Sequence, residues 1–417
     1  MRVLVLDGNE NQAVACVRSL ARAGRRVLVG SPEGWSKAGW SRGAAGGFRY
    51  PAPQRDAAGF VRRVAEEVAR EPGTLVLPMT ERTTLPLSER RASIYEAGGR
   101  LVLPSVESVR RAFDKQETTR LAASLGVAVP RTEVVANDED ARRVMRESVY
   151  PVVLKPRSSE EVTAAGGVVA TGAPLYARDA REFEEAYGEI SRRSPAVLVQ
   201  EFVEGAGAGY FALMREGEPR AEFAHRRVRD VRPTGSGSAV RVSVRPDPVL
   251  REQSLAILRA LGWHGVAMVE FRVRPDGTPV FMEVNGRFWN SLPLAVYAGA
   301  DFPAMVAELA ERGEVEPRFN YQEGVRCRWL LGDFRHLLEV WRGAPEGYAG
   351  PFPKRGRALL DFLTPVRGTR HDNFQWRDPL PELGDWLDFA FRRLPAGFKR
   401  SAAAREEVNA QRGYSHP

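Results

Sequence analysis

Cysteine, histidine and long apolar runs are all scarce in this sequence of 417 residues. Its two cysteines, Cys16 and Cys327, each lie in an apolar pattern, which predicts buried free thiols and a reducing compartment. The five histidines lack zinc-type spacing, so none of the common zinc sites is expected. No apolar run approaches the length of a membrane span, and the strand-like RVLVL near the start does not resemble a signal peptide. We therefore expect a cytoplasmic protein with no membrane partner.

Lysine is also rare, although the chain is basic, with a formal net charge of +8. Only five of its 61 basic residues are lysines, namely Lys37, Lys115, Lys155, Lys354 and Lys399. The arginines are spread along the chain without a nucleic-acid-binding motif, so no nucleic-acid partner is expected, and an anionic small substrate such as a nucleotide explains the charge equally well. Because arginine supplies most of the positive charge, a lysine at an informative position is a candidate functional residue.

The order of strand-like and helix-like segments predicts three regions of mixed α/β and α+β structure. Short apolar strands alternate with helical patterns over residues 1–112, which predicts an N-terminal Rossmann-like domain with a parallel sheet. One of these strands is expected at 99–104. The turn after the first strand, DGNEN, lacks the G-x-G-x-x-G pattern, so no dinucleotide site is expected there. Residues 313–417 predict a small mixed C-terminal region with short amphipathic helices and a frayed tail after Phe398.

The segment VEFRVRPDGTPVFMEVNGRFWN, residues 269–290, predicts a β-hairpin around Asp276-Gly277. A two-residue loop there places Glu270 opposite Glu283 and puts Asn285 on the same face as Glu283. Two carboxylates so placed must share a proton, face water or share a cation. Carboxylate and carboxamide oxygens suit Mg²⁺ or Mn²⁺. The alternative is a solvated strand face on which Arg272 neutralises the acids.

Two of the rare lysines lie where a phosphate can be bound. Lys115 falls in the first turn of a helix capped by Asp114, where the helix dipole disfavours a cation. Either a phosphate or the neighbouring carboxylates Asp114 and Glu117 can compensate that charge. Lys155 ends a buried strand and precedes a loop rich in serine and glycine, whose backbone N–H groups can fold over phosphates. Strands often end in lysine, so this second pattern alone is weak.

Together these residues resemble the ATP-grasp superfamily, and more narrowly the carboxylate–amine ligases whose ATP-binding region is similar to carbamoyl phosphate synthase. The resemblance covers about residues 1–310 and is most specific in the hairpin and the helix that follows it. It implies a two-subdomain ATP-grasp core over 113–312. The smaller subdomain, about 113–195, would cover the ATP, and the larger, about 196–312, would hold the metal and the substrate.

The resemblance also implies roles for individual residues. Glu270, Glu283 and Asn285 would bind the Mg²⁺ (or Mn²⁺) ions that bridge the ATP phosphates. Lys115 and Lys155 would reach those phosphates. For Arg287 it implies a place facing the transferred phosphoryl group. Because arginine binds carboxylates and phosphates bidentately, the candidates for holding the substrate carboxylate and its phosphate are Arg226, Arg227, Arg229, Arg241 and Arg287. Of these we assign Arg287 and Arg241 as catalytic.

The stretch VQEFVEG matches the hinge that binds adenine in this superfamily. The backbone of Glu201 and Val203 would recognise the base, and the remaining ATP-binding residues here would be Gln200, Phe202 and Glu204. The stretch departs from the family at two places. GAGAG follows where many relatives carry an acidic residue that holds the ribose, and Phe202 stands where several have a tyrosine or another bulky ring.

The activity implied is an ATP-dependent carboxylate–amine ligase that forms an amide through an acyl phosphate and releases ADP and phosphate. Its partners would be ATP, a small carboxylate and an amine, which is expected to be an amino acid, and a homodimer is compatible with this reading. The first alternative is a carboxylase or carbamoyl-type kinase, although the sequence contains neither a biotin-carrier motif nor a second ATP-grasp copy. The second is a nucleotide-binding protein without catalysis, against which the intact set of acids and Arg287 argues.

Overall fold

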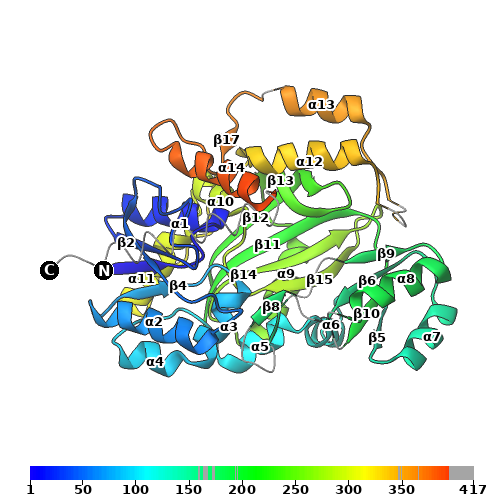
Figure 1. The fold of residues 1–417 in the computed structure, drawn as a ribbon, viewed down its shortest axis with the longest axis horizontal. Coiled ribbons are helices and arrows are strands. Elements are labelled where there is room, and N and C mark those ends of the chain that lie inside the picture. Colours follow the sequence, from blue (N-terminus) through cyan, green and yellow to red (C-terminus); the bar gives the residue numbers. More distant parts are fainter. Residues whose placement is uncertain are drawn as a thin grey trace.

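The computed structural model describes residues 1–157, 160–162, 168–170, 174–192, 194, 196–345, 348, 350–364 and 366–393. The tail after Phe398, which we expect to be frayed, lies outside these residues. Figure 1 shows three sheets placed side by side along the molecule, with the first sheet at one end, a long curved sheet in the middle and a small sheet at the other end. The predicted mixed α/β architecture with an N-terminal parallel sheet is confirmed.

The first sheet has four parallel strands in the order β3-β2-β1-β4. Its strands are β1 (Arg2–Val5), β2 (Arg26–Ser31), β3 (Ala44–Arg49) and β4 (Leu75–Leu77). Its helices are α1 (Asn11–Arg22), α2 (Ala57–Ala69), α3 (Glu81–Glu89), α4 (Arg91–Glu96) and α5 (Val106–Phe113). The strand expected at 99–104 is wrong, because this segment makes only a single bridge, between Arg100 and Leu75, before it leaves the edge of the sheet.

The small sheet has the order β5-β10-β6-β9 and is antiparallel throughout. Its strands are β5 (Thr132–Val135), β6 (Val152–Pro156), β9 (Leu175–Ala177) and β10 (Val197–Glu201). The helices that precede or cover it are α6 (Lys115–Ser124), α7 (Asp138–Glu147) and α8 (Ala180–Ile190). A separate pair, β7 (Glu160–Val162) and β8 (Val168–Ala170), follows Lys155.

The long sheet has seven strands in the order β15-β14-β11-β12-β13-β16-β17. These are β11 (Ala206–Arg215), β12 (Glu218–Arg232), β13 (Ser236–Val244), β14 (Gly265–Val273), β15 (Pro279–Asn285), β16 (Arg326–Arg328) and β17 (Arg370–His371). Three helices accompany it, namely α9 (Pro248–Ala260), α10 (Leu292–Ala298) and α11 (Phe302–Arg312). The stretch 231–242 is mostly strand, because β12 and β13 pair down to Arg232 and Ser236.

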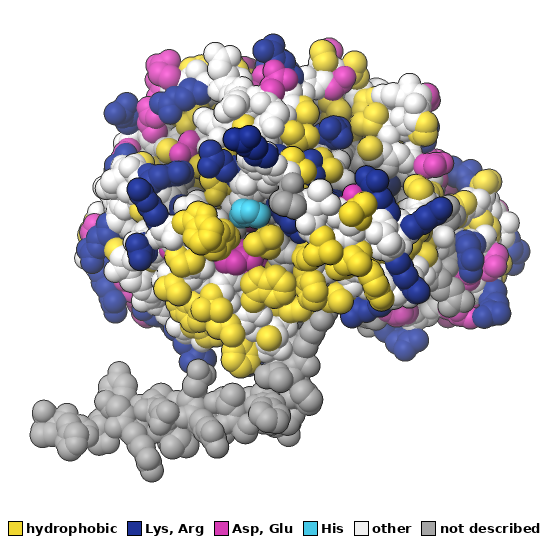
Figure 2. Space-filling model, turned by 90° about the horizontal axis from the view of Figure 1, so that it is seen from above, with side chains coloured by type: hydrophobic (Ala, Val, Ile, Leu, Met, Phe, Trp, Pro, Cys, Tyr) yellow, Lys and Arg dark blue, Asp and Glu magenta, His cyan; other side chains and the backbone are white. Residues whose placement is uncertain are grey.

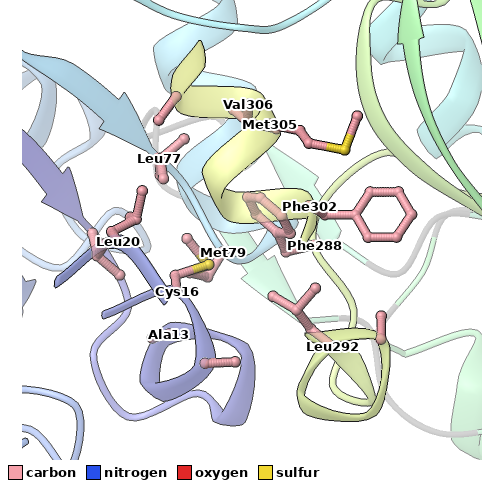
Figure 3. Packing of buried hydrophobic residues seen from close by; sticks show 14 of the residues in the cluster. Ala13, Cys16, Leu20, Leu77, Met79, Phe288, Leu292, Phe302, Met305 and Val306 are labelled. Atoms are coloured by element: carbon pink, nitrogen blue, oxygen red, sulfur yellow. The ribbon is translucent and has the colours of Figure 1, made fainter. Parts of the chain in front are cut away.

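Two apolar clusters cover the two faces of the long sheet. On one face, side chains such as Tyr210, Phe271 and Phe281 pack with the buried side of α9. On the other face, Phe211 and Met268 join a cluster that continues through α10 and α11 into the first sheet. Figure 3 shows part of that cluster, in which Cys16 of α1 lies next to Met79 and residues of α10 and α11 complete the core. This continuous core fixes the carboxyl ends of β1 and β4 relative to the end of β15.

The C-terminal helices are α12 (Leu330–Arg342), α13 (Arg355–Leu363) and α14 (Leu380–Arg393). Buried ion pairs tie this region to the first sheet, with Arg18 Nε 2.8 Å from Asp378 Oδ2 and Lys37 Nζ 2.6 Å from Asp385 Oδ1. Figure 2 shows exposed apolar side chains gathered on the face seen from above. Both cysteines are free and buried, as predicted.

Within the described residues, no single helix is long and apolar enough to cross a membrane. The pair α10 and α11, which are bent by 86° at the break between them, passes that test together by length and composition only.

Candidate active site

The hairpin of β14 and β15 places Glu270 opposite Glu283, as the sequence predicts, but by a different route. Val273 pairs with Pro279, so the loop has five residues instead of the expected two. Pairing then shifts between Glu270 and Phe271, because Phe271 faces Phe281 and leaves Met282 as the extra residue. This bulge offsets the longer loop and restores the predicted opposition of the two acids.

Each of these carboxylates has its own cationic neighbour. Arg227 Nη2 lies 2.7 Å from Glu270 Oε1, and Lys115 Nζ lies 3.6 Å from Glu283 Oε2. Arg272, the neutralising residue of the solvated-face alternative, instead donates hydrogen bonds to backbone carbonyls, of which Gly205 O is 3.1 Å away. Glu270 and Glu283 are therefore part of a charged cluster with Arg227 and Lys115, and Arg272 is not their partner.

Arg227 reaches Glu270 by crossing β11, which lies between their two strands. A Cβ atom at Gly207 would stand only 2.8 Å from Arg227 Nη1, and Gly209 is the direct partner of Glu270. Gly207, the middle residue of GAGAG, thus leaves room for the guanidinium above the sheet. That GAGAG departs from the family pattern is visible in the sequence, but its contact with Arg227 is not.

Lys115 and Lys155 meet in this cluster from two different elements. Asp114 caps α6 through the N–H groups of Gln116 and Glu117, and its carboxylate is bound by Arg157 Nη2 at 2.6 Å. Asp114 is therefore not the residue that compensates Lys115.

Lys155 is buried at the end of β6. Burial and the nearby Lys115 cation lower the pKa of Lys155 to about 8, against the opposing effect of Glu283 and Glu270. Two lysines whose charges oppose each other provide a site for an anion.

Glu283 is held ionised by its surroundings. Burial raises the pKa of this carboxyl, but Lys115, Lys155, a hydrogen bond from Asn285 and the charge of Arg287 outweigh that effect and lower the pKa overall. Asn285 Nδ2 donates to Glu283 Oε1 at 3.1 Å, and Arg287 Nη2 donates to Asn285 Oδ1 at 3.0 Å. The three residues that we predict from the end of β15 therefore form one connected chain of polar contacts.

The oxygen donors of Glu270, Glu283 and Asn285 fit Mg²⁺ by their chemistry, since they are two carboxylates and a carboxamide on one strand face. The amide of Asn285 presents its nitrogen to Glu283 and its oxygen to Arg287. Direct coordination by Asn285 thus requires this amide to rotate. No group of three or more His, Cys, Asp or Glu side chains suited to a metal occurs in the described part of the chain.

The predicted hinge, residues 199–205, begins within the last residues of β10, and its side chains contact other protein groups. Gln200 Nε2 donates to Thr132 Oγ1 at 2.8 Å, and Glu201 Oε1 accepts from Arg274 Nη2 at 2.5 Å. The Phe202 ring lies 6.1 Å from the ring of Tyr176 and 5.9 Å from that of Tyr348. With their side chains engaged in this way, these residues have mainly the backbone to offer a ligand.

A cavity of about 560 Å³ opens beside the hinge. Glu204 lines it together with Arg227 and Arg272, and so does Asp230, which the sequence analysis did not single out. Burial raises the pKa of Asp230, although Arg227 acts in the opposite direction. Glu204 and Asp230, together with Asp361 of α13, are the carboxylates of this cavity wall, and carboxylates can accept hydrogen bonds from sugar hydroxyls.

The other predicted arginines lie differently. Arg287 lies at the cluster, whereas Arg226 is exposed and Arg229 Nη1 is paired with buried Asp333. Arg241 is 1% exposed and its Nη2 lies 2.5 Å from both carboxylate oxygens of Asp372. The guanidinium of Arg241 is therefore already bound by the carboxylate of Asp372, which belongs to the C-terminal region. The catalytic role of Arg241 stays a prediction.

No family model matches the sequence. The chain is 29% identical over 265 residues to the carbamoyl phosphate synthase large chain, N-terminal section, of Methanopyrus kandleri, covering 61% of this chain and 45% of the relative. It thus spans less than half the length of that curated relative.

Two solved structures share the fold. N5-carboxyaminoimidazole synthetase from Staphylococcus aureus has a TM-score of 0.61 with 14% identity, covering 85% of this chain and 90% of that one. L-amino acid ligase from Bacillus licheniformis has a TM-score of 0.57 with 17% identity, covering 76% and 75%. Together with the sequence relative, these likenesses confirm the resemblance of this chain to the ATP-grasp superfamily.

Proposed function

We propose that this protein is an ATP-dependent carboxylate–amine ligase that forms an amide through an acyl phosphate and releases ADP and phosphate. The observation that carries the proposal is the meeting of Lys115, Lys155, Glu270, Glu283 and Arg287 at one place, although they come from different elements. Phosphoryl transfer depends chiefly on positioning and charge neutralisation, which cations and metal ligands supply.

In this proposal, each residue of the site binds one part of the substrates. Lys155 and Lys115 hold the ATP phosphates, and the hinge backbone at Glu201 and Val203 binds the base. Arg287, next to Asn285, binds the transferred phosphoryl group and the substrate carboxylate, since a guanidinium suits both anions. When bound, Mg²⁺ held by Glu270, Glu283 and Asn285 would neutralise negative charge on the phosphates.

The carboxylase or carbamoyl-type kinase remains the second candidate, because two of the three reported similar proteins are named for carbamoyl phosphate and N5-carboxyaminoimidazole synthesis. L-amino acid ligase favours the first candidate. The acceptor distinguishes them. ADP release that depends on an added amino acid or small acid supports the ligase, whereas release that depends on bicarbonate alone supports the second candidate.

The test is a screen of the purified protein with ATP and Mg²⁺ against panels of amino acids and small acids, with ADP and AMP measured separately. We expect ADP and orthophosphate, and ¹⁸O from a labelled carboxylate should reach the phosphate. AMP with pyrophosphate, or label that never reaches phosphate, would contradict the acyl-phosphate route, because charge at the β/γ end of ATP stabilises only γ-transfer.

From the sequence and the resemblance we also propose domain boundaries at 112/113 and 312/313 and a subdomain boundary at about 195/196. On the same grounds we propose a cytoplasmic location and a homodimer. The substrates are proposed by class only, as ATP, a small carboxylate and an amine.

A further inference from the structure

The exposed apolar side chains of this protein are concentrated in its C-terminal region. Of the fifteen large apolar side chains that are exposed in the described part of the chain, eight lie between residues 359 and 391. Figure 1 places the helices of this stretch, α13 and α14, at the top of the molecule, and Figure 2 shows a band of apolar side chains on the face seen from above. Six of the eight define the surface that we call the C-terminal apolar face, namely Leu360, Leu363, Trp376, Leu380, Leu383 and Phe391.

Helices α13 and α14 are apolar on their outer sides as well as their inner sides. The inner rings of Phe362 on α13 and Trp386 on α14 lie 6.3 Å and 5.3 Å from the same ring, that of Phe334 on α12. Because both helices pack against one residue of α12, their outer sides lie near each other. Members of the C-terminal apolar face recur at helical spacing along these outer sides, at Leu360 and Leu363 of α13 and at Leu380, Leu383 and Phe391 of α14.

Positive charge accompanies this face. Between residues 350 and 391, every described acidic side chain is buried or half-buried. The lysines and arginines of the same stretch are all exposed, namely Lys354, Arg355, Arg357, Arg367, Arg370 and Arg377. Only one ion pair is recorded among these six cations in the described residues, between Arg357 and Asp361 at 3.0 Å. The surroundings of the C-terminal apolar face therefore favour an anionic partner.

Two occupants from within this protein have the wrong charge. A second copy that docked through the same face would bring two sets of exposed cations together, and like charges oppose association. Residues 399–412 contain four basic and two acidic residues, so the C-terminal tail is also cationic.

The shape and composition of the face favour a membrane over a protein partner. Two cavities lie next to α13, of about 560 and 220 Å³, and no member of the face lines either of them. Anchor residues of a protein partner usually fill such pockets. Trp376 is instead 90% exposed. Trp, Leu and Phe beside Lys and Arg is the composition of helices that lie in the interface of an anionic membrane.

We propose that the C-terminal apolar face binds the surface of a membrane that contains anionic lipids, with Trp376 and the leucines of α13 and α14 among the headgroups. Such a face lies on a membrane and does not cross it. The scarcity of long apolar runs, from which we expect no membrane partner, therefore does not argue against it. The inference is independent of the proposed ligase activity.

Docking through this face would hold the candidate active site close to the membrane. Ala358 and Asp361 of α13 line the cavity of about 560 Å³ beside the hinge. Arg229 Nη2 donates to Asp361 O at 3.1 Å, and Arg328 Nη2 donates to Phe362 O at 2.9 Å, so α13 is tied to β12 and β16. Helix α13 thus contributes to the cavity wall on its inner side and to the C-terminal apolar face on its outer side.

The test is co-sedimentation of the full chain with vesicles of phosphatidylcholine alone or with about 30% phosphatidylglycerol, at low and high salt. An apolar variant combines Leu363→Ser with Trp376→Ala, and a charge variant combines Arg367→Gln with Arg377→Gln. The control combines Val249→Ser with Arg62→Gln, which changes one exposed apolar and one exposed basic residue outside the face. Thermal unfolding checks that each variant is folded.

We expect the unaltered protein to bind the anionic vesicles, and to bind more weakly at high salt or to phosphatidylcholine alone. The apolar variant should lose affinity tenfold or more, as the exposure of a leucine and a tryptophan predicts on the scale of about 1.4 kcal/mol per decade. The charge variant should lose roughly fivefold for each charge removed, and the control should stay within about twofold of the unaltered protein.

Three results would overturn the inference. One is the absence of binding to anionic vesicles. Another is equal binding by the apolar variant and the unaltered protein, which would reduce the effect to adsorption of a basic protein. The third is a dimer, detected by analytical ultracentrifugation, that dissociates in the apolar variant and does not bind vesicles, which would assign the face to a second copy of this chain.

Discussion

The ammonium nitrogen of Lys115 lies 3.6 Å from a carboxylate oxygen of Glu283, although 168 positions separate the two residues along the chain. Lys115 begins α6, and Glu283 lies on β15. This contact joins the segment before the small sheet to the edge of the long sheet. It is also the point at which the predicted phosphate-binding and metal-binding residues meet.

Lys155→Ala should lower the rate of ADP release by about 10²–10³-fold, because it removes a preorganised cation from the phosphate site. The exposed lysine of α13's N-cap provides the control, as Lys354→Ala should leave the rate unchanged. Circular dichroism should show both variants folded. Retained turnover in Lys155→Ala would remove this residue from the site.

Nucleotide binding should take up protons near pH 8. The pKa of Lys155 is about 8 without ligand, so roughly half of these side chains are neutral at that pH, and bound phosphate raises the pKa by favouring the charged form. ATP affinity should accordingly fall as the pH rises above 8. Calorimetry in buffers of different ionisation enthalpy measures the uptake, which should be absent in Lys155→Met.

The same shift affects folding stability with a definite sign. The folded-state pKa lies below the ordinary value of 10.5, so between pH 8 and 10.5 the unfolded chain binds more protons than the folded one. This group therefore destabilises the fold below pH 8, and that penalty is relieved as the pH rises through this interval. Urea unfolding of the unaltered protein and of Lys155→Met should differ most below pH 8.

Binding of a non-hydrolysable ATP analogue should require Mg²⁺ or Mn²⁺ and should be lost, by tenfold or more on the scale of about 1.4 kcal/mol per decade, in Glu283→Ala. Glu252→Gln, at an exposed position of α9, is the matched control. Titration calorimetry with and without chelator gives the comparison. Equal affinity under both conditions would show that the opposing acids do not bind a metal.

Arg241→Ala should destabilise the fold, since it leaves the fully buried carboxylate of Asp372 without its cation. Loss of one member of a buried ion pair typically costs ~3–5 kcal/mol. The double variant Arg241→Met with Asp372→Leu should recover much of this loss. If the double variant is stable yet inactive, the catalytic assignment of Arg241 gains support, whereas stability and activity recovered together would make the residue structural.

The sequence by itself determined the local features of this protein. The Asp-Gly turn and alternating apolar residues predict the hairpin, and the spacing of Glu270 and Glu283 predicts their opposition, because side chains on strands repeat every two residues. Because lysine is scarce, the sequence also indicates Lys115 and Lys155 as candidate functional residues. These features depend on residues a few positions apart or on composition, so they can be predicted from one amino-acid sequence.

Only the tertiary structure decided which distant groups meet. The sequence predicted neither β3, which reads AAGGFR, nor the pairing of Arg227 with Glu270 across the glycines of β11. Nor does it indicate that Asp372 binds Arg241 or that a carboxylate oxygen of Glu81 lies 4.0 Å from Arg287 Nη2. Such contacts depend on how three sheets pack around a shared core, and no local periodicity encodes that arrangement.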